Sequence, residues 1–182
     1  MRNYLIAITL VAMPTLYLVG CSQKKENAEI VVNSTAASPT IKVITLARNI
    51  PSEIKAIPSE NTGRCAVDIV NEPVKGDVAR INRKAGLSIY GWALDEKRAV
   101  VSPIVLLQLT NGVENYYGQL NRRGDRGDLA TAFGNPEFVN AGFGGIVDIA
   151  SLPAGLYEIY LIQNTENLTS RCATNKKIEL SD

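Results

Sequence analysis

Short apolar segments separated by turn residues set the fold class of this chain. From residue 64 onward, β-branched and aliphatic residues occur in brief runs, and Gly, Pro, Asn or Asp stand between most of them. Runs of this length and spacing are typical of the strands of an all-β domain. We expect strands at residues 65–70, 87–94, 104–109, 115–120, 144–149, 156–163 and 176–180.

About seven strands at such regular spacing predict an Ig-like antiparallel β-sandwich. Residues 110–112, Thr-Asn-Gly, form a strong turn signal and predict a hairpin between the two strands that flank them. Residues 152–155, Leu-Pro-Ala-Gly, carry Pro and Gly at turn positions. This second turn predicts that the strand 156–163 pairs back on the strand before it.

One segment departs from the strand pattern. Residues 128–133 are helix-prone and end at Gly134, so we expect one short helix there. Leu129 and Phe133 are four residues apart, which places them on one helical face, and we expect that face to cap the core. Several strands are apolar on both faces, which is typical of strands that are covered on both sides or that meet a partner.

The charge balance and the missing histidines exclude several classes of function. The chain has 19 basic residues, 18 acidic residues and no histidine. A balanced surface argues against nucleic acid as a partner, because phosphate neutralisation needs a basic patch. Without histidine there is no His-activated nucleophile and no His metal ligand. The carboxylates show no pair spaced for hydrolysis, and Asp125 and Asp128 lie in no calcium loop. We expect no enzyme activity, no metal and no cofactor.

The N-terminal residues resemble the signal peptide of a bacterial lipoprotein. Arg2 precedes an uncharged, mostly apolar stretch that ends in Leu-Val-Gly-Cys at residues 18–21. This tetrapeptide is similar to the lipobox, in which cleavage before the cysteine exposes it for lipidation. The resemblance implies palmitate-type acyl chains on Cys21, and two or more chains make membrane binding stable. An uncleaved anchor helix and a secretory signal cut elsewhere are the alternatives.

The resemblance also implies a domain plan and a location. Residues 1–20 would be the signal peptide, 21–62 the lipidated N-terminus with a flexible tether, and 63–182 the β-sandwich. Residues 40–46 alternate in polarity, so a strand within the tether is an alternative. We expect a lipid-anchored protein of the bacterial cell membrane or outer membrane, facing the periplasm or the cell surface.

Two cysteines remain besides Cys21. Cys65 and Cys172 form an even pair, which in an oxidising compartment favours a disulfide. A bridge between them would join the two ends of the domain. Closing a loop of about a hundred residues contributes about 4–5 kcal/mol in the chain-entropy model. Two buried free thiols are the alternative.

A second resemblance covers residues 91–161. The motifs in this stretch resemble an accessory β-sandwich module of bacterial extracytoplasmic proteins, some of which are linked to surface-polysaccharide biosynthesis. The resemblance implies an accessory domain and carries over no catalytic residue. The matching motifs are Gly-Trp-x-x-Asp at 91–95, an Arg-rich turn at 122–128, Gly-Phe at 142–143, and Leu-Pro-x-Gly-x-Tyr at 152–157.

The candidate ligand-binding residues are aromatic or cationic. We expect Trp92, the only tryptophan, to occupy a core position in the sandwich, and stacking on a sugar ring is the alternative. We expect the Arg-rich turn to be self-paired and solvated, and a site for a carboxylate or phosphate on a glycan is the alternative. The full set is Trp92, Tyr116, Tyr117, Arg122, Arg123 and Arg126.

Together these features predict a membrane-anchored envelope lipoprotein that acts as a binding or scaffolding module. Its partners would be the membrane, through the lipid anchor, and an envelope protein or a glycan. A carbohydrate-binding accessory domain is the first alternative, and a cell-envelope hydrolase is the second.

Overall fold

The computed structural model describes residues 42–52, 54, 56–58, 62–165 and 168–182. The predicted signal peptide, the lipidation site Cys21 and the first part of the predicted tether lie outside the described residues. The helical elements are α1 (Gly127–Phe133), η1 (Arg83–Ala85) and η2 (Pro136–Asn140). The strands are β1 (Val43–Thr45), β2 (Arg64–Val70), β3 (Glu72–Pro73), β4 (Val78–Asn82), β5 (Leu87–Leu94), β6 (Ile104–Thr110), β7 (Asn115–Arg122), β8 (Gly142–Asp148), β9 (Gly155–Thr165) and β10 (Leu168–Ser181).

The predicted all-β class is confirmed, and so are the seven predicted strands. The strand predicted at 87–94 has those bounds in β5, whereas the strand predicted at 176–180 is only the last part of the long β10. The short helix predicted at 128–133 is α1. The described ranges contain no helix with the length and apolarity needed to cross a membrane.

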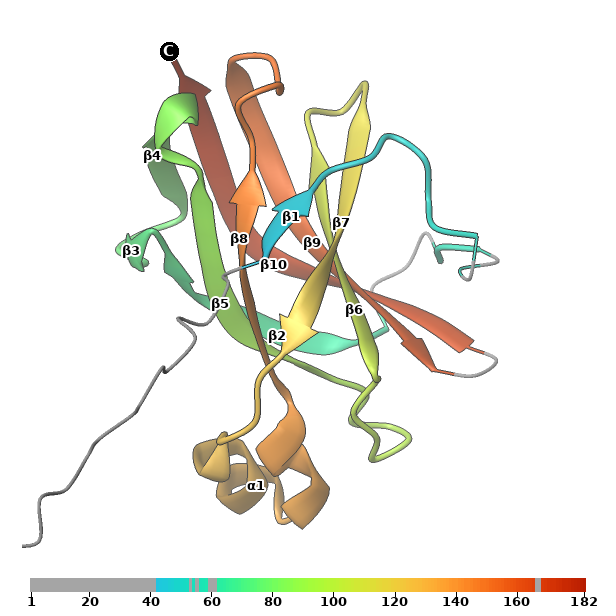
Figure 1. The fold of residues 1–182 in the computed structure, drawn as a ribbon. Helices are drawn as coiled ribbons and strands as arrows, with labels where there is room; N and C mark the ends of the chain where they lie inside the picture. Colours follow the sequence, from blue (N-terminus) through green and yellow to red (C-terminus); the bar gives the residue numbers. More distant parts are fainter. Residues whose placement is uncertain (1–41, 53, 55, 59–61, 166–167) are drawn as a thin grey trace, which may run out of the picture. The chain divides into compact units, whose positions relative to one another are not determined.

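The strands form one nearly closed sheet (Figure 1). Their order is β3-β2-β5-β8-β7-β6-β9-β10-β4, and β1 pairs with β8 beside this path. The pairs β1–β8 and β4–β10 are parallel, and the others are antiparallel. Strand β7 pairs with both β6 and β8. It therefore joins the strands on its two sides into one sheet, whereas a sandwich would keep them in two separate sheets. The architecture is therefore barrel-like and not clearly the Ig-like sandwich that the sequence predicted.

One of the two predicted turn pairings is confirmed and the other is wrong. Strands β6 and β7 form the predicted hairpin. Strand β9 does not pair back on β8, because it lies between β6 and β10 instead. The turn between β8 and β9 buries Leu152 in the core, and Tyr157 Oη donates a hydrogen bond to Pro153 O at 2.9 Å. These contacts hold the turn across the end of the sheet, so that β9 pairs with β6 and not with β8.

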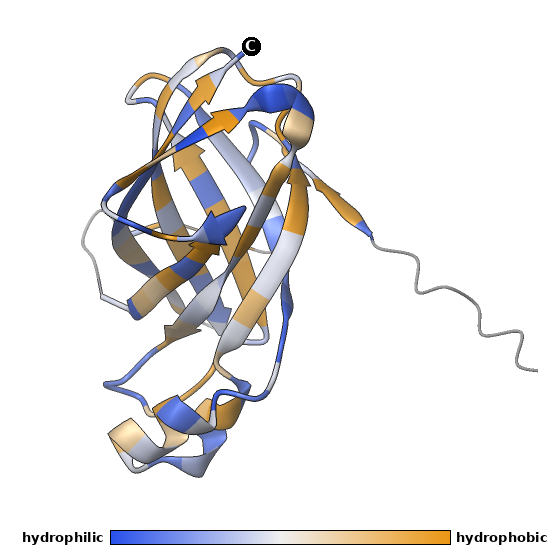
Figure 2. Cartoon of the chain, turned by 90° about the vertical axis from the view of Figure 1, so that its left-hand side faces the viewer, coloured by the Kyte–Doolittle hydropathy of each residue, from blue (hydrophilic) through white to orange (hydrophobic). Residues whose placement is uncertain are grey.

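Alternation along the strands builds two apolar layers. Leu107 of β6 and Leu161 of β9 are fully buried in the main core inside the sheet. Leu106 and Ile162 point to the outer face, where Ile54 of the N-terminal segment packs on them. Figure 2 shows hydrophobic and hydrophilic residues alternating along the strands. The strands that are apolar on both faces are thus covered on both sides.

The N-terminal segment contributes a strand to the sheet. Strand β1 pairs with β8, while Ala47 exchanges two backbone hydrogen bonds of 2.9 and 2.7 Å with Tyr117 of β7. Figure 1 shows β1 between these two strands. The Ile44 side chain enters the core, since a Cβ on Gly118 or Gly145 would lie 2.8 or 2.3 Å from it. This part of the predicted tether therefore belongs to the folded unit, which begins before residue 63.

The predicted disulfide is present. Cys65 of β2 and Cys172 of β10 are bonded, with their Cα atoms 6.1 Å apart. The two strands are not neighbours in the sheet order, so the bridge joins parts of the sheet that backbone hydrogen bonds leave separate. The alternative of two free thiols does not hold.

The helical elements that follow β7 cover one end of the sheet. Leu129 of α1 and Phe138 of η2 are buried beside Leu94 of β5, and Phe133 packs on them. The prediction that one face of the helix caps the core is confirmed. Gly134 ends α1 in the left-handed conformation, with φ of 63°.

Candidate functional site

The two candidate tyrosines lie on opposite faces of β7. Tyr116 points into the core, where its ring meets the edge of Tyr157 at 6.1 Å and its hydroxyl donates to Glu114 at 2.6 Å. This hydrogen bond to the carboxylate raises the pKa of Tyr116. Tyr117 points outward into the layer covered by Ile54, and burial raises its pKa. Because both rings are buried and face apart, they form no common platform for a sugar.

Trp92 is half-buried beneath the helical end. Its ring meets the edge of Phe133 at 6.3 Å, and Phe133 in turn meets Phe138 at 5.6 Å. The guanidinium of Arg64 lies 5.0 Å from the Phe133 ring. The structure thus places the tryptophan in a small aromatic cluster, apart from the candidate tyrosines.

Two arginines of the turn after β7 have partners within the domain. Arg123 lies over the Tyr90 ring at 4.9 Å. Arg126 pairs with Asp68 at 2.9 Å and holds Asp128 through Nε and Nη2 at 2.9 and 2.8 Å. The hydrogen bonds from Arg126 lower the pKa of Asp128 to about 2. The predicted self-paired turn is thus present in part, because Arg126 and Asp128 pair within the turn while Asp68 and Tyr90 belong to β2 and β5.

Arg122 has a different environment from the other candidate arginines. It continues the inward-facing row of β7 two residues beyond Leu120, so its side chain points to the end of the core. Its Nε donates to Ser102 O at 2.6 Å and its Nη1 to Ala141 O at 2.9 Å. Its Nη2 is buried, and within the described part of the chain it has no hydrogen-bond partner. Burial lowers the pKa of Arg122 to about 10.

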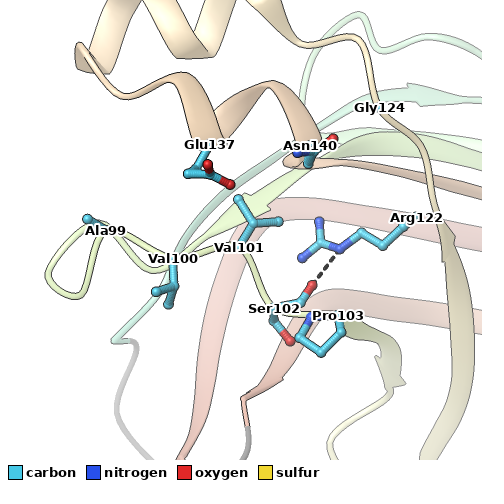
Figure 3. Close-up of a pocket in the computed structure, with 9 residues that line it drawn as sticks. All are labelled: Ala99, Val100, Val101, Ser102, Pro103, Arg122, Gly124, Glu137 and Asn140. Atoms are coloured by element: carbon cyan, nitrogen blue, oxygen red, sulfur yellow. Dashed lines mark hydrogen bonds between the residues drawn. The ribbon is translucent and has the colours of Figure 1, made fainter.

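A pocket of about 380 Å³ lies beside Arg122 (Figure 3). The segment 99–103 forms one wall, Arg122 and Gly124 form the second, and η2 supplies Glu137 and Asn140. Figure 3 shows the Arg122 guanidinium reaching toward the segment 99–103, with the two η2 side chains across from it. The pocket therefore combines a half-buried cation with polar groups that η2 exposes to solvent.

Local contacts fix the wall formed by the segment 99–103. Asp95 and Val100 exchange two backbone hydrogen bonds of 3.0 and 3.2 Å. Ala99 has a positive φ of 56°, a conformation that costs a residue with a Cβ about 1 kcal/mol, and its carbonyl accepts from Asn135 at 3.3 Å. Ser102 Oγ lies 2.6 Å from the carbonyl oxygens of both flanking strands, β6 and β9. Contacts within the domain therefore hold the backbone of this wall in place.

The sequence identified one of the residues that make this pocket. Arg122 was a candidate, but the predictions did not include Ser102, Glu137 or Asn140. The alternation of Tyr116 and Leu120 could have placed Arg122 inward and Arg123 outward. No comparable signal brings η2 and the segment 99–103 together, because they meet only in the folded sheet. Among the described residues, no cluster of three or more acidic or cysteine side chains could hold a metal ion.

No protein-family model matches this chain, and no curated protein matches it. Among solved structures, an endo-β-1,4-mannanase from Thermotoga petrophila is similar, with a TM-score of 0.40 and 11% identity. The similar part covers 65% of this chain and 20% of the mannanase chain. The chain thus spans a fifth of the length of that enzyme, and a likeness of this degree assigns no activity.

Proposed function

We propose that this chain is a membrane-anchored envelope lipoprotein whose β domain acts as a binding or scaffolding module. Cys21 would carry the acyl chains after cleavage at the lipobox. The domain would face the periplasm or the cell surface from the cell membrane or the outer membrane. The observation that carries the proposal is the Cys65–Cys172 bridge, because disulfides form and persist in oxidising compartments.

The pocket beside Arg122 favours a binding role over a hydrolytic one. Its volume of about 380 Å³ lies within the range of small-molecule sites. Glu137 is the carboxylate that lines it, whereas glycoside hydrolysis normally uses two carboxylates that flank the scissile bond. We therefore keep the hydrolase only as the weakest alternative.

Carbohydrate binding remains the second candidate, though not through an aromatic platform. Trp92, Tyr116 and Tyr117 are held in separate apolar clusters. The pocket instead offers polar groups for a sugar. In it, the guanidinium of Arg122 lies among side chains that can accept hydrogen bonds from hydroxyl groups or donate to them. A glycan ligand is thus favoured at the pocket.

The anchor is tested by replacing Cys21 with serine and Ser22 with alanine in separate variants. We expect palmitate label and membrane association in the wild type and in Ser22→Ala. Cys21→Ser should lose the label, because serine has no thiol to form the thioether. Mass spectrometry of the N-terminal peptide measures the modification directly. An unmodified Cys21 in the wild-type peptide, with residues 1–20 still attached, would sink the proposal.

The binding role is tested with the purified full-length chain in detergent. Incubation with bacterial surface polysaccharide should release no reducing ends, while cross-linking in cells should recover a defined partner or glycan. A catalytic release of reducing ends would favour the hydrolase instead. The variant Gly124→Glu serves as a control in both measurements, because it adds a side chain to the lining of the Arg122 pocket.

A further inference from the structure

We propose that the pocket beside Arg122 binds a carboxylate-bearing sugar, with the sugar carboxylate on the Arg122 guanidinium. This inference rests on the proposed binding function and names the ligand class for it.

The first step is that Arg122 forms no ion pair with a carboxylate among the described residues. Several other arginines of the domain pair with carboxylates, as in Arg64–Glu96 and Arg80–Glu179. The hydrogen bonds that Arg122 makes to the described residues all go to neutral backbone carbonyls. Arg122 is half-buried and its Nη2 atom is fully buried, and charged groups removed from water in this way are normally paired with an anion, because the desolvation is costly. A ligand carboxylate would supply that anion.

The second step is the Arg122 atom whose hydrogen-bonding capacity is left for a carboxylate. Nη2 of Arg122 is buried and lacks a partner among the described residues, while Nε and Nη1 are already engaged. A carboxylate oxygen on Nη2 would form a charge-assisted hydrogen bond, which is stronger than a neutral one. In Figure 3 the Val101 side chain lies beside the guanidinium. Since Nη2 is covered, we expect the Val101 side chain to turn aside when the ligand enters.

The third step separates a sugar acid from other anions. The Glu137 carboxylate faces the pocket and would repel a doubly charged phosphate more strongly than a singly charged carboxylate, and it can accept hydrogen bonds from hydroxyl groups. Asn140 adds an amide that both donates and accepts. Val100 and Pro103 offer an apolar wall to the C–H face of a pyranose ring. A hexuronic acid combines one carboxylate, several hydroxyls and such a face.

The test titrates the full-length chain in detergent with sodium glucuronate, glucose, inorganic phosphate and glycine, followed by ligand-observed NMR. We expect saturable binding of glucuronate. Glucose lacks the carboxylate, so it should bind at least about tenfold more weakly. Phosphate and glycine should also bind more weakly than glucuronate. If any of the three binds as tightly as glucuronate, the proposal is wrong.

Two matched variants test the position of the site. Gly124→Glu adds a carboxylate to the lining of the pocket, and its Cβ would lie 3.7 Å from Asn140 Oδ1, an ordinary contact. The new side chain should compete for Arg122 and weaken glucuronate binding at least about tenfold. Gly127→Glu makes the same change in open space outside the pocket and should bind like the wild type. Equal binding by the two variants would overturn the proposal.

Failure of this inference is distinguishable from failure of the proposed function. Lipidation of Cys21 and recovery of a cross-linked partner are measured without glucuronate. A lipidated chain that recovers a partner but binds no glucuronate overturns only the ligand class. A chain that binds glucuronate but carries no lipid supports the pocket and overturns the anchor.

Discussion

Removing the Cys65–Cys172 bridge should lower the free energy of unfolding by about 4–5 kcal/mol. The bridge joins residues 107 positions apart, and the chain-entropy model gives about 4.8 kcal/mol for a loop of that length. In a domain of this size each kcal/mol shifts Tm by about 2–4 °C, so Tm should fall by about 10–20 °C. The fold itself should persist, because β2 and β10 keep their partners β5 and β9.

Urea and thermal unfolding of three samples separate the effect of the bridge from that of packing. These are the oxidised wild type, the reduced wild type, and the double variant Cys65→Ala with Cys172→Ala. Cys172 is 5% exposed, so truncation removes some core contacts that reduction leaves in place. Both altered samples should nonetheless lose most of the 4–5 kcal/mol. A loss below about 1 kcal/mol in the reduced wild type would refute the reasoning that loop closure constrains the unfolded chain.

Three further predictions concern single residues. Gly145→Ala should lower the free energy of unfolding in urea by about 1–3 kcal/mol, because the new Cβ would lie 2.3 Å from the end of the Ile44 side chain, which must then repack in the core. Unchanged stability would count against that packing. The free energy of unfolding should fall less between about pH 5 and pH 2 in Asp128→Asn than in the wild type. The pKa of Asp128 is lowered from 3.8 to about 2, so its contribution is present above pH 3.8 and is lost as the pH falls toward 2. Arg122→Gln should lower the free energy of unfolding by about 1–3 kcal/mol in thermal unfolding, since the carbonyl of Ser102 loses its donor. Unchanged stability would show that this hydrogen bond is dispensable.

Local signals were enough to predict the central strands but not the edges of the sheet. The strand at 87–94 and the hairpin of β6 and β7 follow from alternation and one turn. Strand β4 was missed because Ile81 is its one buried residue, and its partner β10 lies about a hundred positions away in the sequence. The first half of β10 carries Arg171 and Thr174 among small residues, so its composition resembles a loop. Distant pairing, rather than local propensity, makes both segments strands.

The pairing of β9 shows the same limit. A turn with Pro and Gly predicts a reversal of the chain, but it does not say which strand the returning segment meets. Here buried Leu152 folds the turn over the end of the core, and β9 joins β6. The pocket likewise depends on three segments that meet only in the tertiary structure, so the sequence could offer Arg122 without its surroundings.

Strand β1 has a mechanical consequence if Cys21 is tied to a membrane. Tension from the anchor would enter the domain at Val43 and peel β1 from β8 first, because this ladder spans three residues. At Cys65 the force would then divide between two covalent paths, the backbone that continues into β2 and the disulfide to Cys172. Strand β1 would therefore detach at low force. The loop closed by the disulfide would then distribute the remaining force between β2 and β10.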